Sequence, residues 1–439
     1  MDRDKIQQKN ILFGVTFKGL SVFLNFLIVP FLILFLGKTE YGVWVTVFSF
    51  VNWIFTFDLG IGQGLRNKLT EALSVDDQNK ARQIISTSYI FITLFSIVIF
   101  IIGVAVIFLV NFQDLLNYNE KSGSYLQCFV LLSFFFTVIN FILSLYKKLY
   151  LAVHKSFMVE LINAFFQAFY LLVILCWIKL ELEKNLINLI VIFGVLNLLV
   201  AFIATFIFFR FQNKLSFSLK YFNLNEGKLL FGLGGKFFII NICLLVILST
   251  DNIIISNVLG PSFVTDYFTI QKVFQFLVVI FTVVLASSWS LYSEAFTKKD
   301  YNWIKRNLKK MNFYFLGILI FGILILIFIE QILVFWIGKG VVEIPKGLAL
   351  ANMIYTFIFC FTNIYMFFIN ASNKINVQMY LYILGAIINI PLSFYLVNLL
   401  GTSTGVILST IICFLPLLVI MPIQSKKIID RLEKESKIN

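Results

Sequence analysis

The sequence predicts an all-α membrane protein of about 12 transmembrane helices, divided into two bundles of six. Three observations predict this fold. The chain of 439 residues is 60% hydrophobic and only 13% charged, whereas a soluble domain carries roughly 25% charged residues. Apolar runs of about 18 residues or more recur along the chain, as expected for helices that cross a membrane. Short motifs of the first half also recur in the second half.

Twelve apolar runs are long enough to span the hydrocarbon core of a bilayer. The first follows a short basic leader, and no small-residue cleavage site follows it, so we expect it to remain as a helix. The predicted spans are 10–36, 42–63, 84–110, 125–151, 157–178, 187–209, 229–259, 262–288, 311–337, 347–371, 378–400 and 403–423.

The placement of lysine and arginine predicts the orientation of these spans. If the N-terminus is cytoplasmic, 27 of the 35 basic residues fall in cytoplasmic segments and 6 in external ones. The remaining two, Lys18 and Lys272, lie within spans. This bias satisfies the positive-inside rule, so we expect a multi-pass protein with both termini in the cytoplasm. The net charge of +13 follows mostly from this topology and requires no nucleic-acid partner.

Two similar motifs indicate that the chain is a duplicated unit. The stretch LFGVTFKG contains Lys18 and the stretch LFGLGGKF contains Lys236, at a separation of 218 residues. Two further pairs share an offset of 223: the dipeptide Leu-Gly at 36–37 and 259–260, and the segments 70–82 and 293–305. Matches in the same order at nearly the same offset are typical of an internal repeat.

Six helices per repeat is an even number, so both halves enter the membrane from the same side. We expect one bundle over residues 1–211, a second over 212–423 and a cytoplasmic tail over 424–439. The tail and the basic loop EAFTKKDYNWIKRNLKK (294–310) have the pattern of amphipathic helices that lie on anionic lipid.

Lysines within the spans are candidate functional residues, because an ammonium group at mid-membrane costs about 2.5–3.5 kcal/mol. Lys18 and Lys236 either extend to the cytoplasmic interface or line a water-filled cavity where they attract an anion. Lys272 lies deeper in its span, beside Gln271 and Gln275, which favours a cavity position.

Acidic and neutral polar residues within the spans allow more than one interpretation. Asp58 precedes Arg66 by eight positions on one helix face, so the two form either an interfacial pair of charges or part of a functional site. Asp58 and Asp251 are candidates for coupling or gating. Stripes of neutral polar residues either join neighbouring helices or line a hydrophilic cavity: Ser133, Thr137, Asn140 and Ser144; Asn352, Thr356, Asn363 and Asn370; Asn163 and Gln167.

Several classes of enzyme are excluded by what the sequence lacks. With a single histidine, His154, and five cysteines without a CxxC motif, the chain offers neither a His-based metal site nor a Ser-His-Asp triad. The phosphate-loop pattern GxxxxGK[ST] is absent, and no predicted external loop exceeds about 20 residues. We therefore expect a protein that is not an enzyme, without catalytic residues or a bound metal.

The twelve spans in two halves, with LFGVTFKG in the first span, LGKTEYGVW after it and FDLGIGQGLRNKLTEAL across the second, resemble one transporter family. This is the polysaccharide-exporter branch of the multidrug/oligosaccharidyl-lipid/polysaccharide (MOP) superfamily, and most of all its Wzx-type flippases of O-antigen or capsule repeat units. The resemblance covers essentially the whole chain. It implies two helical bundles around a central cavity in a bacterial inner (plasma) membrane.

The resemblance also implies a cargo and a set of site residues. The cargo would be an undecaprenyl-pyrophosphate-linked oligosaccharide, moved from the cytoplasmic to the outer leaflet by alternating access. Its pyrophosphate would bind basic cavity residues, for which the matching candidates are Lys18, Arg66, Lys236 and Lys272. No cofactor is implied, and a proton or sodium gradient is one candidate energy source. Membrane lipids and other glycan-assembly membrane proteins are the further expected partners.

Two alternatives belong to different functional classes. A cation-coupled multidrug exporter of the same superfamily would share the architecture, but it should favour acidic residues in its cavity. A membrane-embedded glycan polymerase or acyltransferase should carry a large external loop or intramembrane histidine and arginine residues, and the sequence shows neither.

Overall fold

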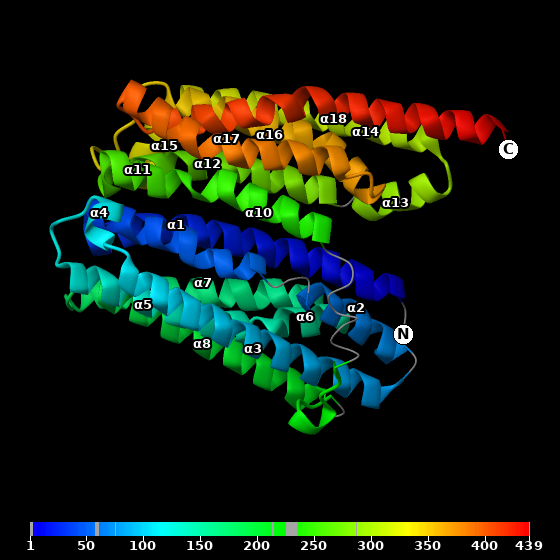
Figure 1. Cartoon of the computed structure of the whole chain (residues 1–439), viewed down its shortest axis with the longest axis horizontal. Helices are drawn as coiled ribbons and strands as arrows, with labels where there is room; N and C mark the ends of the chain where they lie inside the picture. The colour runs from blue at the N-terminus through cyan, green and yellow to red at the C-terminus, as the bar shows by residue number, and fades with distance from the viewer. Residues whose placement is uncertain are drawn as a thin grey trace. The chain divides into compact units, whose positions relative to one another are not determined.

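The computed structural model describes residues 3–57, 61–74, 76–212, 215–224, 235–286 and 288–438. Within these residues the regular structure is helical throughout, without a strand (Figure 1), which confirms the all-α prediction. The chain packs as two compact units, Met1–Phe238 and Ile239–Asn439.

The described residues contain 11 helical segments that are long and apolar enough to cross a membrane. The first, Phe13–Thr56, has 44 residues, or ~66 Å of helix, which is about twice the thickness of a bilayer core. Its backbone leaves the helical conformation at Gly37 (φ 78°, ψ 168°), where two helices meet at a kink. The described part of the chain therefore holds the predicted 12 membrane helices.

The first unit starts with α1, which packs along α7, while α5 lies between α3 and α8 (Figure 1). Its elements are α1 (Arg3–Val51), η1 (Asn52–Phe57), α2 (Ile61–Ser74), α3 (Gln78–Leu109), α4 (Phe112–Leu116), α5 (Gly123–Leu143), α6 (Leu145–Ala152), α7 (Ser156–Lys179), α8 (Leu186–Phe211) and η2 (Leu219–Tyr221).

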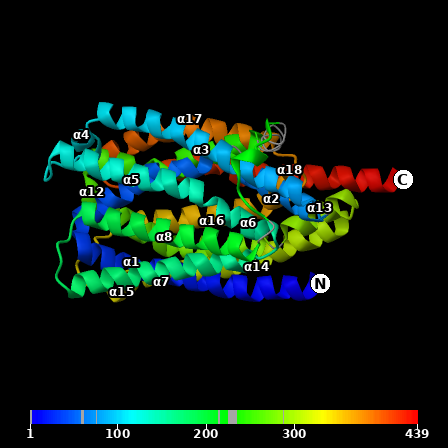
Figure 2. The ribbon, with the colours of Figure 1, turned by 90° about the horizontal axis from the view of Figure 1, so that it is seen from below.

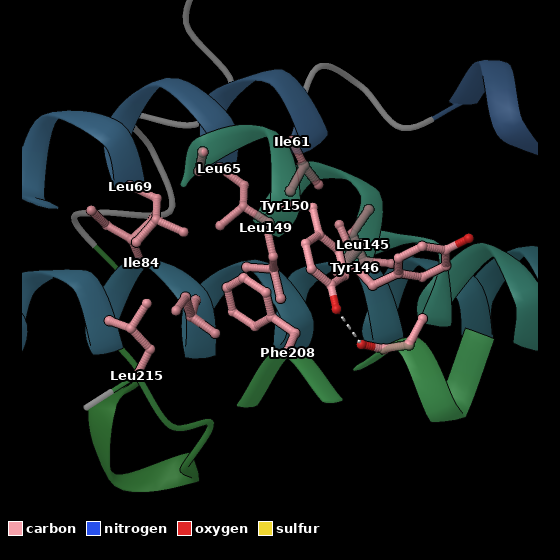
Figure 3. Close-up of a cluster of buried hydrophobic side chains, with 14 of the residues drawn as sticks. Ile61, Leu65, Leu69, Ile84, Leu145, Tyr146, Leu149, Tyr150, Phe208 and Leu215 are labelled. Carbon is pink, nitrogen blue, oxygen red and sulfur yellow. Dashed lines mark hydrogen bonds between the residues drawn. The ribbon is translucent and has the colours of Figure 1, made fainter. Parts of the chain in front are cut away.

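The second predicted span, 42–63, is too long. The helix ends at Val51, the short 3₁₀ helix η1 follows, and α2 is a separate amphipathic helix. Ile61, Leu65 and Leu69 recur every four residues on one face of α2 and are buried against α6, α3 and α8 (Figure 3). This spacing is that of an apolar helical stripe facing a core, so α2 packs on the other helices of its unit and is not the end of a membrane span.

The segment after α8 packs back onto α3. The Ser86 hydroxyl accepts a hydrogen bond from the Ser218 backbone N–H at 3.1 Å, and the Thr87 hydroxyl accepts one from that of Asn223 at 3.0 Å. These bonds explain why the first unit continues beyond residue 211, where the sequence places the end of the first bundle. The predicted boundaries at 211 and 423 remain predictions about how the chain is organised.

In the second unit, α16 lies between α12 and α18, and α17 packs on α18 (Figures 1 and 2). Its elements are α10 (Gly235–Ser249), α11 (Asp251–Leu259), α12 (Pro261–Ala286), α13 (Trp289–Thr297), α14 (Tyr301–Ile327), α15 (Ile329–Trp336), α16 (Leu348–Ala371), α17 (Asn376–Leu400) and α18 (Thr404–Ile438).

The C-terminal tail does not form a separate interfacial helix. It continues α18, whose 35 residues span ~52 Å, more than a bilayer core requires, and which extends past the end of α17 (Figure 2). Ile429 and Leu432 are buried in a cluster with Leu308 of α14, and Lys305 pairs with Glu433 at 2.7 Å. The apolar face of the tail therefore packs on α14, and the expected contact of the tail with anionic lipid remains a prediction. The basic loop 294–310 is not a single helix either: its first residues belong to α13 and its last residues to α14.

The internal repeat recurs in the backbone at the offset of 223 residues. Gly37 and Gly260 both adopt a positive φ (78° and 104°) between two helices, a conformation that glycine adopts without steric cost. Asp77 and Asp300 both cap a long helix by accepting a hydrogen bond from the N–H three residues ahead. The residue before each aspartate has a positive φ, 55° and 56°. The duplication inferred from the sequence thus extends to local geometry.

Candidate functional site: buried charges in each unit

Lys18 forms an ion pair with an acidic residue that the sequence did not single out. Its Nζ lies 3.4 Å from Oε2 of Glu160 on α7, and the two side chains are 48% and 26% exposed. The pair forms because α1 and α7 pack along each other. The prediction offered two environments for Lys18, the interface or a cavity; the structure adds a specific partner. A signal was present, since Glu160 is an acidic residue inside the predicted span 157–178.

A second lysine, Lys147 on α6, lies close enough to interact electrostatically with this pair. It is attracted by Glu160 and repelled by Lys18 and by its neighbour Lys148. Its Nζ also lies 5.9 Å from the ring centroid of Tyr146. The sequence analysis counted Lys147, at the end of the predicted span 125–151, only among the basic residues of the cytoplasmic side, so its proximity to an intramembrane charge was missed.

Arg66 is exposed on α2, about 100° around the helix from the centre of the apolar stripe that packs into the core. On another side of α2, about 160° around the helix from Arg66, Lys68 donates a hydrogen bond of 2.9 Å to Glu71, which lowers the pKa of that carboxyl group. Asp58 lies outside the described residues, so its pairing with Arg66 remains a prediction. Lys236 is the second residue of α10, but its side chain also lies outside the described part, and its role remains a prediction.

In the second unit, Asp251 is the centre of a buried polar chain. Asp251 and Tyr267 are 1% and 0% exposed, and the tyrosine hydroxyl donates a hydrogen bond of 2.6 Å to Oδ2 of the carboxylate. Gln271 Nε2 donates in turn to the Tyr267 oxygen at 3.3 Å, and Tyr355 interacts electrostatically with Asp251. Oδ1 of Asp251 has no hydrogen-bond partner among the described residues.

The sequence identified Asp251 and Gln271 but not Tyr267, because a tyrosine in an apolar span carries no distinguishing signal.

Lys272 follows Gln271 on α12, about 100° further around the helix. It is partly buried, and its Nζ lies 5.5 Å from the ring centroid of Phe268, one turn earlier. Such cation–π contacts stabilise an ammonium group by about 0.5–2 kcal/mol, more where water is excluded.

Members of the polar stripes form hydrogen bonds mainly within their own helices. The hydroxyls of Ser133 and Thr137 donate to carbonyls four residues earlier in α5. The side-chain amides of Asn352 and Asn363 do the same in α16. These local bonds satisfy their donors without a ligand. Among the described residues no group of three or more His, Cys, Asp or Glu is placed to hold a metal ion.

Comparisons with known proteins relate most of the chain to proteins named as transporters. No family model matches the sequence. The chain is 24% identical over 375 residues, 81% of each chain, to a putative O-antigen export protein of Yersinia pseudotuberculosis. It is 25% identical over 402 residues, 88% of each chain, to a putative O-antigen transporter of Salmonella typhimurium.

Solved structures show the same fold. A structure described as the inward-facing conformation of a multidrug resistance MATE family transporter of the MOP superfamily superimposes with a TM-score of 0.77. The two sequences are 12% identical, and 95% of each chain is covered. A MOP superfamily transporter from Pyrococcus furiosus, also 12% identical, gives a TM-score of 0.65 over 97% of this chain and 96% of that one. Together these likenesses confirm the resemblance to the polysaccharide-exporter branch of the MOP superfamily that the sequence indicates.

Proposed function

We propose that this chain, which has the MOP transporter fold, is a flippase for lipid-linked oligosaccharides. It moves undecaprenyl-pyrophosphate-linked glycan repeat units, of O-antigen or capsule, from the cytoplasmic to the outer leaflet of the bacterial inner membrane by alternating access. The observation that carries the proposal is the similarity to O-antigen transporters over 81–88% of the chain. The relatives are named as transporters, so the chain is a transport protein rather than an enzyme.

The charge distribution supports an anionic cargo. A pyrophosphate carries about two negative charges, and ammonium or guanidinium groups in a low-dielectric site offset its desolvation. Lys18 and Lys272 lie inside spans, and with Arg66 and Lys236 they are the proposed pyrophosphate ligands. The polyprenyl tail would remain in the surrounding lipid during transport.

Asp251 is the proposed coupling residue, with Asp58 as the second candidate. A proton or sodium gradient can drive transport only if the ion binds the two transport states with different affinity. The buried Asp251 carboxylate, whose Oδ1 accepts no hydrogen bond from the described residues, could bind such an ion. This same feature favours the second candidate function, a cation-coupled drug exporter, since the fold is shared with MATE transporters.

A gene deletion distinguishes the two functions. For a flippase, surface glycan is lost and undecaprenyl-linked repeat units accumulate where only reagents on the cytoplasmic side reach them. The variants Lys18→Ala and Lys272→Ala should lower surface glycan at equal protein level. If glycan display is intact in the deletion strain and the cells retain cationic dyes, the chain is a drug exporter instead. Normal display by both lysine variants would refute the cationic ligands.

A further inference from the structure

The Lys18–Glu160 pair is part of a three-residue charge cluster formed by three helices of the first unit. Lys18 is on α1, Glu160 on α7 and Lys147 on α6. Lys18 and Glu160 are joined by the 3.4 Å ion pair, and Lys147 interacts electrostatically with both. α7 contacts both α1 and α6, so these charges meet because their helices pack together.

The cluster has an excess of positive charge. Glu160 pairs with Lys18 at 3.4 Å, and Lys147 on the adjacent helix α6 brings a second ammonium group close to this pair. Like charges at short range repel each other unless an anion lies between them. Glu160 therefore offsets only part of the positive charge, and the remaining field attracts a second anion.

The bond that Glu160 makes is a weak one. Its Oε2 is shielded from solvent yet has no hydrogen-bond partner among the described residues. The 3.4 Å separation from Lys18 exceeds the roughly 2.7–2.9 Å of a good charge-assisted hydrogen bond. A phosphate oxygen that approached Lys18 more closely would form the better bond, and it would leave Glu160 free to turn away.

The depth of the cluster matches that of a lipid headgroup. Glu160 is the fifth residue of α7 and lies about 6 Å from its start, and Lys147 is the third residue of α6. Both lie near the turn between α6 and α7, on the side that the positive-inside rule makes cytoplasmic. A diphosphate attached to a lipid of the cytoplasmic leaflet lies at this level before it is moved.

We propose that Lys18, Lys147 and Glu160 form the loading site for the diphosphate headgroup, and that Glu160 is an exchangeable counter-ion. In the empty protein Glu160 holds Lys18; the diphosphate displaces Glu160 and is bound by both lysines. This inference rests on the proposed function and adds two residues, Lys147 and Glu160, to its binding site. Glu160 acts against binding, so its removal should strengthen the interaction.

The test is calorimetric titration of the purified full-length protein with inorganic pyrophosphate. Glu160→Gln should bind about fivefold more tightly, the factor that corresponds to the roughly 1 kcal/mol of a partly exposed ion pair. Lys147→Gln should bind at least fivefold more weakly. Lys155→Gln removes the same charge from the adjacent loop outside the cluster, and it should leave binding unchanged.

The proposal is overturned if the wild-type protein binds no pyrophosphate, if Glu160→Gln binds no more tightly than wild type, or if Lys147→Gln and Lys155→Gln behave alike. If Glu160→Gln does not fold, the comparison of the two lysine variants decides alone. The result is distinguishable from that of the deletion experiment. If the affinity of Glu160→Gln is unchanged and glycan is lost on deletion, only this inference is refuted. If Glu160→Gln binds more tightly and glycan display is intact on deletion, the proposed function is refuted, and what is left is a diphosphate site with a different cargo.

Discussion

Replacement of Tyr267 by phenylalanine tests the buried polar chain of the second unit. The change removes the hydroxyl that donates the 2.6 Å hydrogen bond to Asp251 and alters little else in shape. Hydrogen bonds between membrane helices contribute about 0.6 kcal/mol on average and up to about 1.7 kcal/mol. We expect a loss of about 1–2 kcal/mol, near the upper end, because the second carboxylate oxygen has no partner among the described residues to compensate.

The assay is the free energy of unfolding in detergent, measured by titration with a denaturing surfactant. Tyr382→Phe is the matched control in the same unit, because its hydroxyl is also buried but donates only to the Met366 sulfur, at 3.4 Å. It should lose less than the average of about 0.6 kcal/mol. Equal losses in the two variants would refute the reasoning, since the hydrogen bond to Asp251 would then contribute no more than a contact with sulfur.

Two further predictions concern packing in the second unit. Gly405→Ala should lower the free energy of unfolding by about 1–3 kcal/mol or more, because its Cβ would lie 2.5 Å from the Val397 backbone nitrogen. Gly317→Ala is the control, because a Cβ there has open space around it; it should be neutral or stabilising by up to about 1 kcal/mol. If the two glycine variants change the free energy of unfolding equally, α17 and α18 do not approach closely at Gly405. Leu432→Ala should loosen the end of α18 and speed trypsin cleavage there, because this side chain is only 5% exposed. Lys434→Ala is the control, because Lys434 is exposed, and it should leave the rate of cleavage at the remaining sites unchanged. If it speeds cleavage as much as Leu432→Ala does, α14 does not hold the tail.

The fold could be predicted from the sequence because membrane helices leave a strong local signal. Long apolar runs and the placement of basic residues depend on the bilayer rather than on tertiary contacts. The repeat was also visible, and its Asp77 and Asp300 caps have the same geometry. Structure and prediction differ where packing overrides pattern: α2 resembled the end of a span but packs into the core of its unit, and the tail continues α18 and packs its apolar face on α14.

The candidate site could be predicted only in part, because partners come from different helices. Lys18 was identified by its charge, but its pairing with Glu160 depends on how α1 meets α7. Asp251 was likewise identified, whereas the role of Tyr267 depends on the approach of α11 to α12. Such contacts between residues far apart in the chain leave no pattern in a single sequence.

The most direct test of the central claim is transport of a lipid-linked oligosaccharide in proteoliposomes. Undecaprenyl-pyrophosphate-linked repeat units are placed in both leaflets, a proton or sodium gradient is imposed across the membrane, and a glycosidase is added outside. The account predicts that vesicles containing the protein expose nearly all of the glycan to the enzyme, while protein-free vesicles expose only the outer-leaflet share. If both kinds of vesicle expose the same share, with the protein folded and inserted, the chain does not move this cargo and the flippase assignment is wrong.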